Sequence, residues 1–380
     1  MRPASRRVAS GPHKMRDPLH QTTTPALLAG AALPSPPLSR RGLLGGTAAS
    51  ALVAACARPA APEAPWQPQP LPLRPDLRWG FNFAHQHVRG RGYGSPPAAA
   101  ALDEQVALGM RDLALNPFGY APSLGSTDLR WGDDPTMTDD DLRRQGEAAQ
   151  SRGLRLLMKP HLWSPSHWGG AGNMDIRLDA AGWARWFEAY AAFVSHYARL
   201  AQEIGCEGLC VGLEYTQASL ENPGAWAQIA AACRAHFKGR LCYAANWFAE
   251  FEHFADWAAF DCAAVDAYFP LEGQTVAELV TSWQPHLDLL EKAGKTVIFT
   301  EAGYRAVEDG HREPWSPASS RPDPALQARA YEALLRAAVA RPWFGGVYWW
   351  KWFTAAGPDD DSFVPQSPAR AVLRAWSAAR

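Results

Sequence analysis

The chain has 380 residues, of which 47% are hydrophobic and 20% charged, so it can bury a large core in one or two domains. Its formal net charge is −1 and no long run of one sign occurs, which argues against nucleic acid as the main partner. Trp, with 17 residues, outnumbers both Phe (15) and Tyr (10). Such flat rings suit stacking on sugar faces, although filling a core is the alternative use of each one.

The N-terminal segment is predicted to lie outside the folded domain. Residues 1–38 are rich in Pro, Ser and Ala, and Arg40-Arg41 then precede a weakly apolar stretch that ends at Cys56. This order resembles a twin-arginine export signal joined to a bacterial lipobox, in which Cys56 is lipidated and becomes the new N-terminus. A disordered leader with chance arginines and cysteine is the alternative, and the true start could be Met15. The apolar run is too short for a membrane-spanning helix.

Proline-rich residues 57–75 favour an extended, semi-rigid spacer. We therefore expect three parts: a leader over residues 1–55 that is removed, a lipidated Cys56 with a tether over 56–75, and a folded domain over 76–380. The expected location is the cell envelope, at the periplasmic or outer-membrane face. Five further cysteines, an odd number without framework spacing, indicate buried free thiols, and one disulfide among them stays open.

Short apolar runs alternate with longer amphipathic stretches through the folded domain. Helices are expected over 139–153, 180–205 and 324–340, among others. Eight such alternations predict a parallel sheet covered by helices, and eight units in about 300 residues fit a closed (β/α)₈ barrel. An open doubly wound sheet is the competing layout, but residues 81–94 lack the Gly-x-Gly-x-x-Gly spacing. The expected strands are 77–84, 111–118, 154–163, 208–215, 241–247, 263–270, 296–304 and 345–353.

Polar and aromatic residues stand at the end of every expected strand. In a barrel all C-terminal strand ends point to one rim, where active sites lie, so these side chains would converge. A single polar strand end indicates a structural loop contact, whereas eight together indicate a site. The residues are Asn82, His85 and His87; Asn116; His161 and Trp163; Glu214 and Tyr215; Asn246 and Trp247; Asp266 and Tyr268; Glu301 and Tyr304; and Trp349, Trp350, Lys351 and Trp352.

Glu214 and Glu301 end the fourth and seventh expected strands, which lie across a barrel from each other. A carboxylate at the rim of a core costs free energy unless it is paired or used. Two facing carboxylates suit glycoside hydrolysis: one protonates the leaving oxygen and the other attacks the anomeric carbon. A separation of about 5–5.5 Å makes the reaction retaining. Repulsion between them raises the pKa of one, which keeps that acid protonated.

Several motifs in the same order resemble glycoside hydrolase family 113. They are "LNPFGY", "WGDDPTMTDDDLR", "MKPHLW", "LCVGLE", "YAANW", "VDAYFPL", "FTEAGYR" and "GVYWWKWF", and the resemblance runs from Trp79 to Ser367. The family belongs to clan A, retaining barrels with carboxylates on strands four and seven, and its characterised members are chiefly β-mannanases. The resemblance implies Glu214 as acid/base, Glu301 as nucleophile, and β-1,4-mannan or glucomannan as substrate.

The resemblance also implies supporting residues. Tyr268 looks like the tyrosine that orients the nucleophile in related barrels. Strand alternation places Tyr348, Trp350 and Trp352 on one side of the last strand, so Trp350 and Trp352 are predicted sugar platforms unless a bulge reverses the parity. Leu213 stands where many clan A enzymes carry an Asn that contacts the sugar 2-hydroxyl, which leaves the exact sugar open. Sugar hydroxyls or faces are expected to contact Asn116, His161, Trp163, Asn246, Trp247 and Asp266.

Two features of the sequence suggest other functions. His85 and His87 could begin a metal-dependent amidohydrolase barrel, but the expected fourth to sixth strands supply no lysine or histidine ligands. A lipid-anchored polysaccharide-binding barrel without catalysis is the second alternative, and the presence of both glutamates argues against it. No metal or cofactor is expected, because two carboxylates suffice for the chemistry. The expected partners are a polysaccharide or oligosaccharide and, through the anchor alone, a membrane; the protein is expected to be a monomer.

Overall fold

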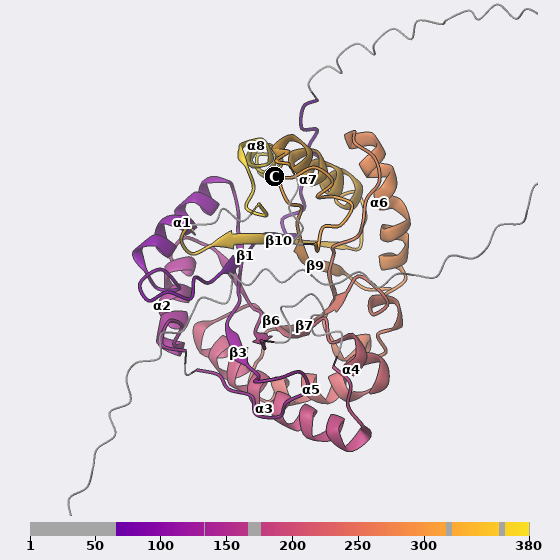
Figure 1. The fold of residues 1–380 in the computed structure, drawn as a ribbon. Helices are drawn as coiled ribbons and strands as arrows, with labels where there is room; N and C mark the ends of the chain where they lie inside the picture. The colour runs from indigo at the N-terminus through magenta and orange to yellow at the C-terminus, as the bar shows by residue number, and fades with distance from the viewer. Residues whose placement is uncertain (1–65, 133, 166–175, 317–320, 357–361, 380) are drawn as a thin grey trace, which may run out of the picture. The chain divides into compact units, whose positions relative to one another are not determined.

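The computed structural model describes residues 66–132, 134–165, 176–316, 321–356 and 362–379 (Figure 1). The twin-arginine pair Arg40-Arg41, Cys56 and the first half of the expected tether, residues 56–65, lie outside the described residues. Within the described ranges, eight parallel strands close into a barrel, as predicted, and the last strand pairs with the first. In order around the barrel these strands are β1 (Arg78–Ala84), β2 (Asp112–Leu115), β4 (Arg155–Met158), β6 (Gly208–Leu213), β7 (Arg240–Asn246), β8 (Ala263–Asp266), β9 (Val297–Ala302) and β10 (Phe344–Phe353).

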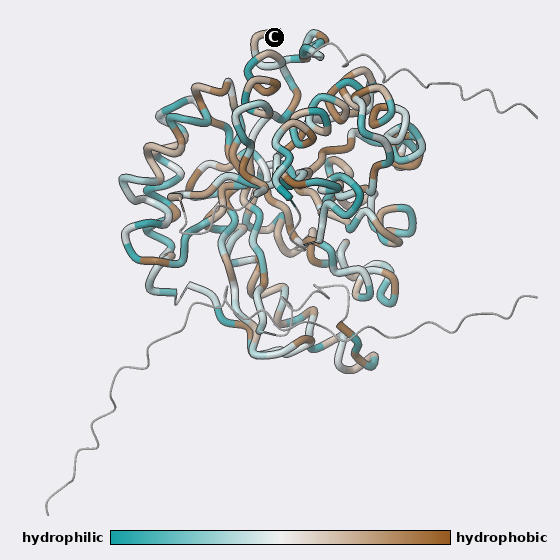
Figure 2. The backbone as a smooth tube through the Cα atoms, turned by 45° about the horizontal axis from the view of Figure 1, so that its top comes forward, coloured by the Kyte–Doolittle hydropathy of each residue, from teal (hydrophilic) through white to brown (hydrophobic). Residues whose placement is uncertain are grey.

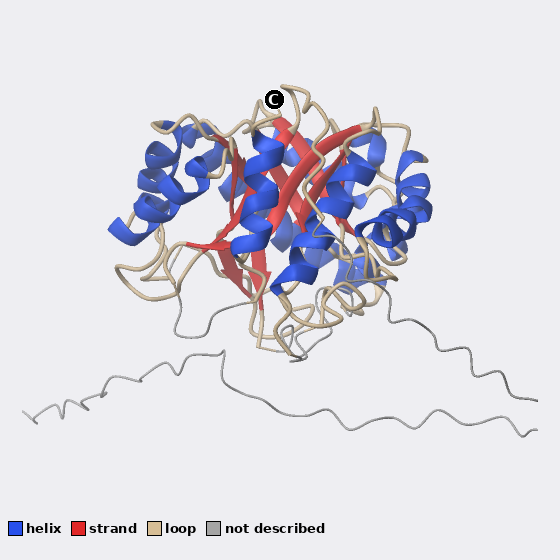
Figure 3. Cartoon of the chain, turned by 90° about the horizontal axis from the view of Figure 1, so that it is seen from above, coloured by secondary structure: helices blue, strands red, loops and turns tan. Residues whose placement is uncertain are grey.

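Helices connect the strands and surround the barrel (Figure 3). The boundaries follow from the sequence: Thr138 and Thr275 each begin a helix with a complete capping box, and Gly205 ends the longest helix in the left-handed conformation. None of the helices in the described part of the chain combines the length and apolar character that crossing a membrane requires. The helices are α1 (Pro96–Ala107), α2 (Asp139–Gln150), α3 (Ala180–Ile204), α4 (Thr216–Glu221), α5 (Ala225–Arg234), α6 (Val276–Glu291), α7 (Pro324–Ala338) and α8 (Ser367–Ser377), with short 3₁₀ turns η3 (Phe251–His253) and η4 (Trp257–Ala259).

Two of the expected strands are each split by a proline. The predicted strand 111–118 breaks at Pro117 into β2 and β3 (Phe118–Tyr120), and the predicted strand 154–163 breaks at Pro160 into β4 and β5 (His161–Trp163). Proline has no N–H for a strand ladder, so pairing stops there. Beyond the breaks, β3 and β5 leave the barrel and pair with each other as a separate two-stranded parallel sheet.

The apolar residues of the strands, brown in Figure 2, are divided between two cores. On β7, Leu241 and Tyr243 point to the helices whereas Cys242 points into the barrel, as strand alternation requires. The barrel interior holds Ala114, Leu157, Cys210, Leu213, Cys242, Ala244, Cys262, Ala264, Ile298 and Tyr348. All five cysteines in the described residues are buried free thiols, as predicted.

Three of these thiols lie side by side in the barrel interior. Cys210 on β6 is the register partner of Cys242 on β7, and the Cys242 thiol is within hydrogen-bonding reach of both Cys210 and Cys262. Small thiol and alanine side chains on β6, β7 and β8 leave room for the larger Tyr348 across the barrel. Sulfur and small apolar side chains therefore fill the interior on that side.

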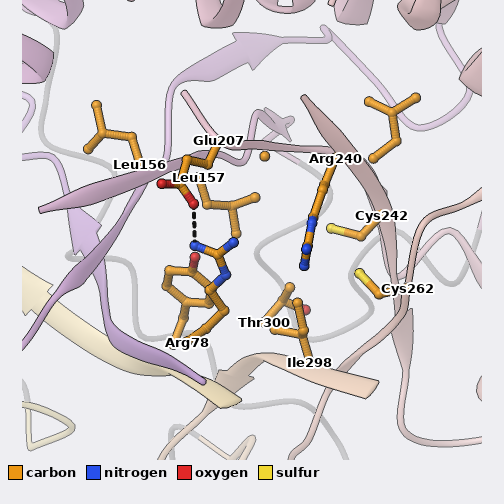
Figure 4. A pocket seen from close by; sticks show the side chains of 12 residues that line it. Arg78, Leu156, Leu157, Glu207, Arg240, Cys242, Cys262, Ile298 and Thr300 are labelled. Carbon is orange, nitrogen blue, oxygen red and sulfur yellow. Dashed lines mark hydrogen bonds and ion pairs between the residues drawn. The ribbon is translucent and has the colours of Figure 1, made fainter. Parts of the chain in front are cut away.

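Ion pairs close the N-terminal end of the barrel. Arg78 pairs with Glu207 at 2.7 Å and with the fully buried Asp112 at 3.1 Å, and Arg155 pairs with Asp112 at 2.6 Å. Figure 4 shows Arg78, Glu207, Arg240 and the thiol of Cys242 around a small pocket at this end. Polar groups at the N-terminal face of such a barrel stabilise the fold, whereas catalytic residues lie at the opposite, C-terminal rim.

Candidate active site

Glu301 lies on β9 near its C-terminal end and is only 6% exposed. Two side chains hold its carboxylate. Tyr268, which follows β8, donates a hydrogen bond from its hydroxyl to Oε2 at 2.6 Å, and the ammonium group of Lys159 forms an ion pair with Oε1. Both carboxylate oxygens are therefore fixed, and the predicted nucleophile has a defined orientation.

Lys159 was not predicted as part of the site. It follows β4, is fully buried, and its Nζ lies 3.6 Å from Oδ2 of Asp266 in addition to its pair with Glu301. Burial by itself lowers the pKa of Lys159, but the charges of Asp266 and Glu301 outweigh burial and raise this pKa above its usual range. Lys159 therefore supplies Glu301 with a permanent counter-ion.

Asp266 does not reach the mouth of the barrel, contrary to the expectation that it contacts sugar. The side chain is fully buried, and its Oδ1 accepts a hydrogen bond from the hydroxyl of Thr300 at 2.8 Å. Burial, together with the neighbouring charge of Glu301, raises the pKa of Asp266 well above its usual value. Asp266 is the last residue of β8, but its side chain is buried inside the protein, where it lies beside the ammonium group of Lys159.

Glu214 directly follows β6 and is partly exposed. Its backbone adopts the left-handed region, with a φ of 53°, which is uncommon for residues other than Gly and costs about 1–3 kcal/mol. Its N–H still donates to the carbonyl of Ala244 at 2.9 Å, and Oε1 accepts a hydrogen bond from Nδ2 of Asn246 at 2.8 Å. Strained backbone of this kind is concentrated at functional sites, where the surrounding structure holds it.

The two glutamates influence each other's charge state. Burial first, and then the negative charge of Glu301, raise the pKa of Glu214 to about 8, while Lys159 and the hydrogen bond from Asn246 act in the opposite direction. Glu214 is therefore protonated at neutral pH. One carboxyl that keeps its proton beside a second that has a counter-ion is the division of labour that general acid and nucleophile require.

Asn246 contacts the predicted acid/base, whereas a sugar contact was expected. Besides its bond to Glu214, its backbone N–H donates to Oε2 of Glu250 at 2.7 Å. Glu250 is fully buried and also accepts bonds from Ser219 and Tyr243, each at 2.6 Å. The hydroxyl of Tyr243 in turn accepts the N–H of Tyr215, the residue after Glu214, at 2.9 Å. A single buried carboxylate thus fixes the segments that follow β6 and β7.

Asn116, His161 and Trp350 lie at the C-terminal end of the barrel, on the side across from β7. Asn116 donates from Nδ2 to Nε2 of His161 at 3.0 Å and to Oδ1 of Asn82 at 3.1 Å. Burial, followed by the positive charges of Lys159 and Lys351, lowers the pKa of His161 well below its usual value, so the ring is neutral. The partly buried Trp350 lies over His161, with ring centroids 6.0 Å apart and planes 27° apart.

Trp352 is not at the mouth, and the prediction of a sugar platform there was wrong. It is 4% exposed, and its ring centroid lies 5.2 Å from that of Phe81 on β1. The guanidinium carbon of Arg370 on α8 lies 4.6 Å from the same centroid. The cause is a bulge: Phe81 pairs with Trp349 but Phe83 pairs with Trp352, so β10 contains one extra residue and its alternation is reset. Trp349 faces the helices as expected and stacks on Tyr331 of α7 at 4.1 Å.

Trp163 and Trp247 occupy different surroundings. Trp163 lies on β5, outside the barrel, where its ring is 5.4 Å from that of Tyr120 on β3. Trp247, the residue after β7, stacks against Trp315 at 5.1 Å and 26°, and meets the buried Phe269 edge-on at 5.6 Å. Trp315 therefore covers one face of Trp247.

The histidines that suggested a metal site serve other contacts. Nδ1 of His85 accepts the N–H of Tyr93 at 3.1 Å, and His87 pairs with Asp134 at 3.0 Å. Among the described residues, no group of three or more His, Cys, Asp or Glu side chains is arranged to hold a metal ion. The geometry gives no support to the amidohydrolase alternative.

Comparison with known proteins decides between the remaining alternatives. The model of Glycoside Hydrolase Family 113 matches residues 81–364. The chain belongs to this family. As a member of family 113, the protein is a glycoside hydrolase, and the binding-only alternative is not needed. No curated protein matches the sequence.

Solved structures agree with this family membership. A GH113 β-mannanase from Alicyclobacillus acidocaldarius, in complex with ManMIm, is 26% identical, with a TM-score of 0.70 over 82% of this chain and 99% of that one. A GH113 β-1,4-mannanase, solved as a complex, is 23% identical, with a TM-score of 0.71 over 80% and 100%. An endo-β-1,4-mannanase from Thermotoga petrophila shares the fold at 12% identity, with a TM-score of 0.51 over 80% and 77%.

Two positioning residues of this family 113 enzyme escaped the sequence analysis. For Lys159 a signal was present, because a lysine directly after the apolar run Leu156–Met158 is almost never buried without a partner, and Glu301 needed one. For Glu250 no signal existed, because it lies in a loop and acts through hydrogen bonds that only the tertiary structure creates.

Proposed function

We propose that this enzyme hydrolyses β-1,4-linked mannan or glucomannan with retention of configuration, using Glu214 as acid/base and Glu301 as nucleophile. The observation that carries the mechanism is the pairing of a protonated carboxyl, whose pKa is raised to about 8, with a carboxylate held by Tyr268 and Lys159. The substrate class is supported by the likeness to a GH113 β-mannanase over nearly the whole folded domain.

In the first step, an oxygen of Glu301 attacks the anomeric carbon while Glu214 gives its proton to the glycosidic oxygen. The bond between that oxygen and the anomeric carbon breaks, and the sugar becomes an ester of Glu301. Tyr268 and Lys159 hold Glu301 in position before the attack, so little reorganisation is needed.

In the second step, Glu214 takes a proton from water as the water oxygen attacks the anomeric carbon and releases Glu301. Ester formation removes the negative charge of Glu301, which is one of the causes that raise the pKa of Glu214. The same residue is therefore a better acid once the intermediate exists, and its carboxylate form can act as the base that the second step requires.

Sugar contacts on the glycone side are assigned to Trp350 and its neighbours. Trp350 is partly exposed above the neutral His161, and Asn116 fixes that histidine. Leu213, the residue before the acid/base, packs in the barrel interior, so polar recognition of the sugar must come from other residues. Trp163, on the separate sheet, is proposed to contact sugar further from the bond that is cleaved.

A screen of β-mannan, glucomannan, xylan and β-glucan tests the substrate. Release of reducing ends from mannan or glucomannan is expected, and proton NMR of the first product should show the β anomer. Hydrolysis of xylan or β-glucan without hydrolysis of mannan would contradict the proposed substrate but not the proposed mechanism. An α anomer as first product would overturn the double displacement.

We also propose that the protein is exported by the twin-arginine route, anchored through a lipid on Cys56, and active as a monomer. The motif around Arg40-Arg41 and Cys56 supports the first two points. Activity as a monomer is supported by the fact that every side chain assigned to the reaction belongs to one chain. Light scattering behind a sizing column measures the molar mass and tests the monomeric state.

A further inference from the structure

Two thiols line the small pocket at the N-terminal end of the barrel. Cys242 lies on β7 and Cys262 stands directly before β8, and both side chains border the pocket in Figure 4. The cavity has a volume of about 20 Å³, which is room for about one water-sized molecule. The proposed catalytic glutamates lie at the opposite rim, so the mechanism makes no use of these thiols.

The backbone brings the two thiols together on one face of neighbouring strands. β7 and β8 pair so that Ala244 faces Ala264, and each cysteine stands two residues before one of these alanines. Every second residue of a strand faces the same way, and all four side chains belong to the barrel interior. Neighbouring strands lie about 4.7–4.9 Å apart, within the separation of about 4.4–6.8 Å between Cα atoms that a disulfide needs.

The surroundings make Cys262 the more nucleophilic thiol of the pair. The hydrogen bond to the thiol of Cys242 lowers the pKa of Cys262 below its usual value, and the charge of Arg240 acts in the same direction, whereas burial opposes both. Hydrogen bonds to Cys210 and Cys262, followed by burial, raise the pKa of Cys242. Figure 4 shows Arg240 beside both sulfur atoms. A reachable thiolate next to a second thiol is the arrangement found at redox-sensing cysteines.

Cys210 is the other thiol that Cys242 contacts, but it is harder to reach. It is fully buried, and its own thiol donates to the carbonyl of Gly212 at 3.2 Å. Of the thiols that the structure describes, only Cys242 and Cys262 line the pocket. An oxidant that enters the pocket therefore meets these two before Cys210.

We propose that Cys242 and Cys262 form a redox-sensitive pair, which hydrogen peroxide converts reversibly into a disulfide between β7 and β8. First, the Cys262 thiolate attacks one oxygen of the peroxide, the O–O bond breaks, hydroxide leaves, and Cys262 becomes a sulfenic acid. Next, the sulfur of Cys242 loses its proton and attacks the sulfur of Cys262, the S–O bond breaks, and water leaves. Two thiols are oxidised, one peroxide is reduced, and two water molecules form.

The disulfide would bear on the segment behind the active site. It closes a loop that contains Asn246 and Glu250, so oxidation ties the residues that position Glu214 to the neighbouring strand. Disulfides persist in oxidising compartments such as the periplasm, where the proposed export signal would take the protein. The proposal itself does not depend on the proposed function, because the oxidation needs no glycan.

Peptide mapping without reductant tests the pair in the folded parent protein, which is treated with peroxide, then unfolded and alkylated. Trypsin leaves Cys242 and Cys262 in one peptide, residues 241–292, whereas the other three cysteines of the folded domain lie in the peptide 200–234. We expect the peptide 241–292 to lose both alkylatable thiols and the mass of two hydrogen atoms, and to regain them with dithiothreitol. Further cleavage after Glu250 should leave two halves that separate only on reduction.

Variants test which thiol reacts first. Cys242→Ala should stop at the sulfenic acid, which dimedone captures on Cys262, whereas Cys210→Ala is the matched control from the same layer and should form the bond as the parent does. Arg240→Gln should slow the loss of thiols several-fold, because less of Cys262 is thiolate. Lys238→Gln removes an exposed cation outside the pocket and should leave the rate unchanged.

The map of the parent alone decides whether the bond forms, so the test does not depend on how well a variant folds. A peptide 241–292 joined to 200–234 would place the bond elsewhere and overturn the pair. So would two thiols that remain alkylatable under conditions that convert free cysteine to cystine, or a sulfinic acid on Cys262 without any bond. Dimedone captured on Cys242 in Cys262→Ala, as fast as on Cys262 in Cys242→Ala, would overturn the order of attack.

Discussion

Asn246 holds Glu214 by a hydrogen bond of 2.8 Å from Nδ2 to Oε1, while its own N–H donates to the buried Glu250. One residue thereby links the proposed acid/base to a buried carboxyl group behind it. The hydrogen bond from Asn246 lowers the pKa of Glu214, whereas the charge of Glu250 raises it. The two neighbours can therefore be distinguished by the direction in which their removal moves the pH profile.

The parent enzyme should lose kcat/KM as pH rises through about 8, because the first step needs Glu214 protonated. Asn246→Ala removes a hydrogen bond that lowers this pKa, so the alkaline limb should move to higher pH. Its rate should also fall, by roughly 10–100-fold, since a bond to an ionisable group is worth about 1.5–3 kcal/mol. Rates of oligosaccharide hydrolysis between pH 5 and pH 10 check this. An alkaline limb that stays in place would contradict the assignment of Glu214.

Glu250→Gln should move the same limb in the opposite direction. Removing the negative charge of Glu250 removes a cause that raises the pKa of Glu214, so activity should be lost at lower pH than in the parent. The amide keeps the size of the side chain and can still accept from Tyr243. The pH profile is again the measurement, because a merely structural defect would lower the rate at all pH values without moving the limb.

The roles of the two glutamates are separable with an activated substrate. Glu301→Gln should be inactive on every substrate, because no leaving group bypasses the covalent step. Glu214→Ala should release dinitrophenolate in the first turnover and then stall, since no base activates water. Azide needs no base, so it should restart turnover and give a glycosyl azide of retained configuration.

On the natural glycan, Glu214→Ala should be slower by roughly 10²–10⁴-fold, the usual contribution of general acid/base catalysis. Azide rescue of Glu301→Ala with inverted configuration, together with a Glu214→Ala variant that is inactive on activated substrates, would exchange the two roles.

Lys159→Met should destabilise the fold as well as abolish activity. It leaves Glu301 and Asp266 buried without their cation, and breaking a buried pair in this way costs about 3–5 kcal/mol. Urea unfolding at neutral pH measures the free energy of unfolding. Lys292→Met, at an exposed position just after α6, is the control and should unfold as the parent does. An unchanged midpoint in Lys159→Met would mean that the buried pair does not stabilise the protein.

The proposed anchor is tested in whole cells. Replacing both Arg40 and Arg41 by Lys should block export, and Cys56→Ser should give a soluble or unprocessed form. One lipid chain binds membranes only marginally, so durable attachment requires the several chains of a mature lipoprotein. Fractionation of cells followed by immunoblotting is the measurement. If the Cys56→Ser protein stays with the membranes as the parent does, the lipoprotein proposal fails.

The barrel and the paired glutamates could be predicted because both depend on local patterns. Apolar runs at regular spacing indicate the strands, and Glu214 and Glu301 stand where such runs end. Trp352 was assigned to the wrong side because one extra residue in β10 reverses the alternation, and the pairing that shows the bulge involves β1, far away in sequence. Asp266 ends a strand like the others, yet only the packing of Lys159 beside it reveals that it faces inward.

The thiols of Cys210, Cys242 and Cys262 lie side by side in the barrel interior, so their reactivity can report on the separation of barrel strands. Cys210 is fully buried, so an alkylating reagent can reach it only when neighbouring strands separate, whereas Cys242 and Cys262 also line the small pocket at the N-terminal end of the barrel. The rate of Cys210 alkylation, followed by mass spectrometry of its peptide, therefore measures how often the strands around β6 separate under native conditions. Because Cys210 lies on β6, Cys242 on β7 and Cys262 directly before β8, the alkylation of each thiol can be followed separately without introducing a label.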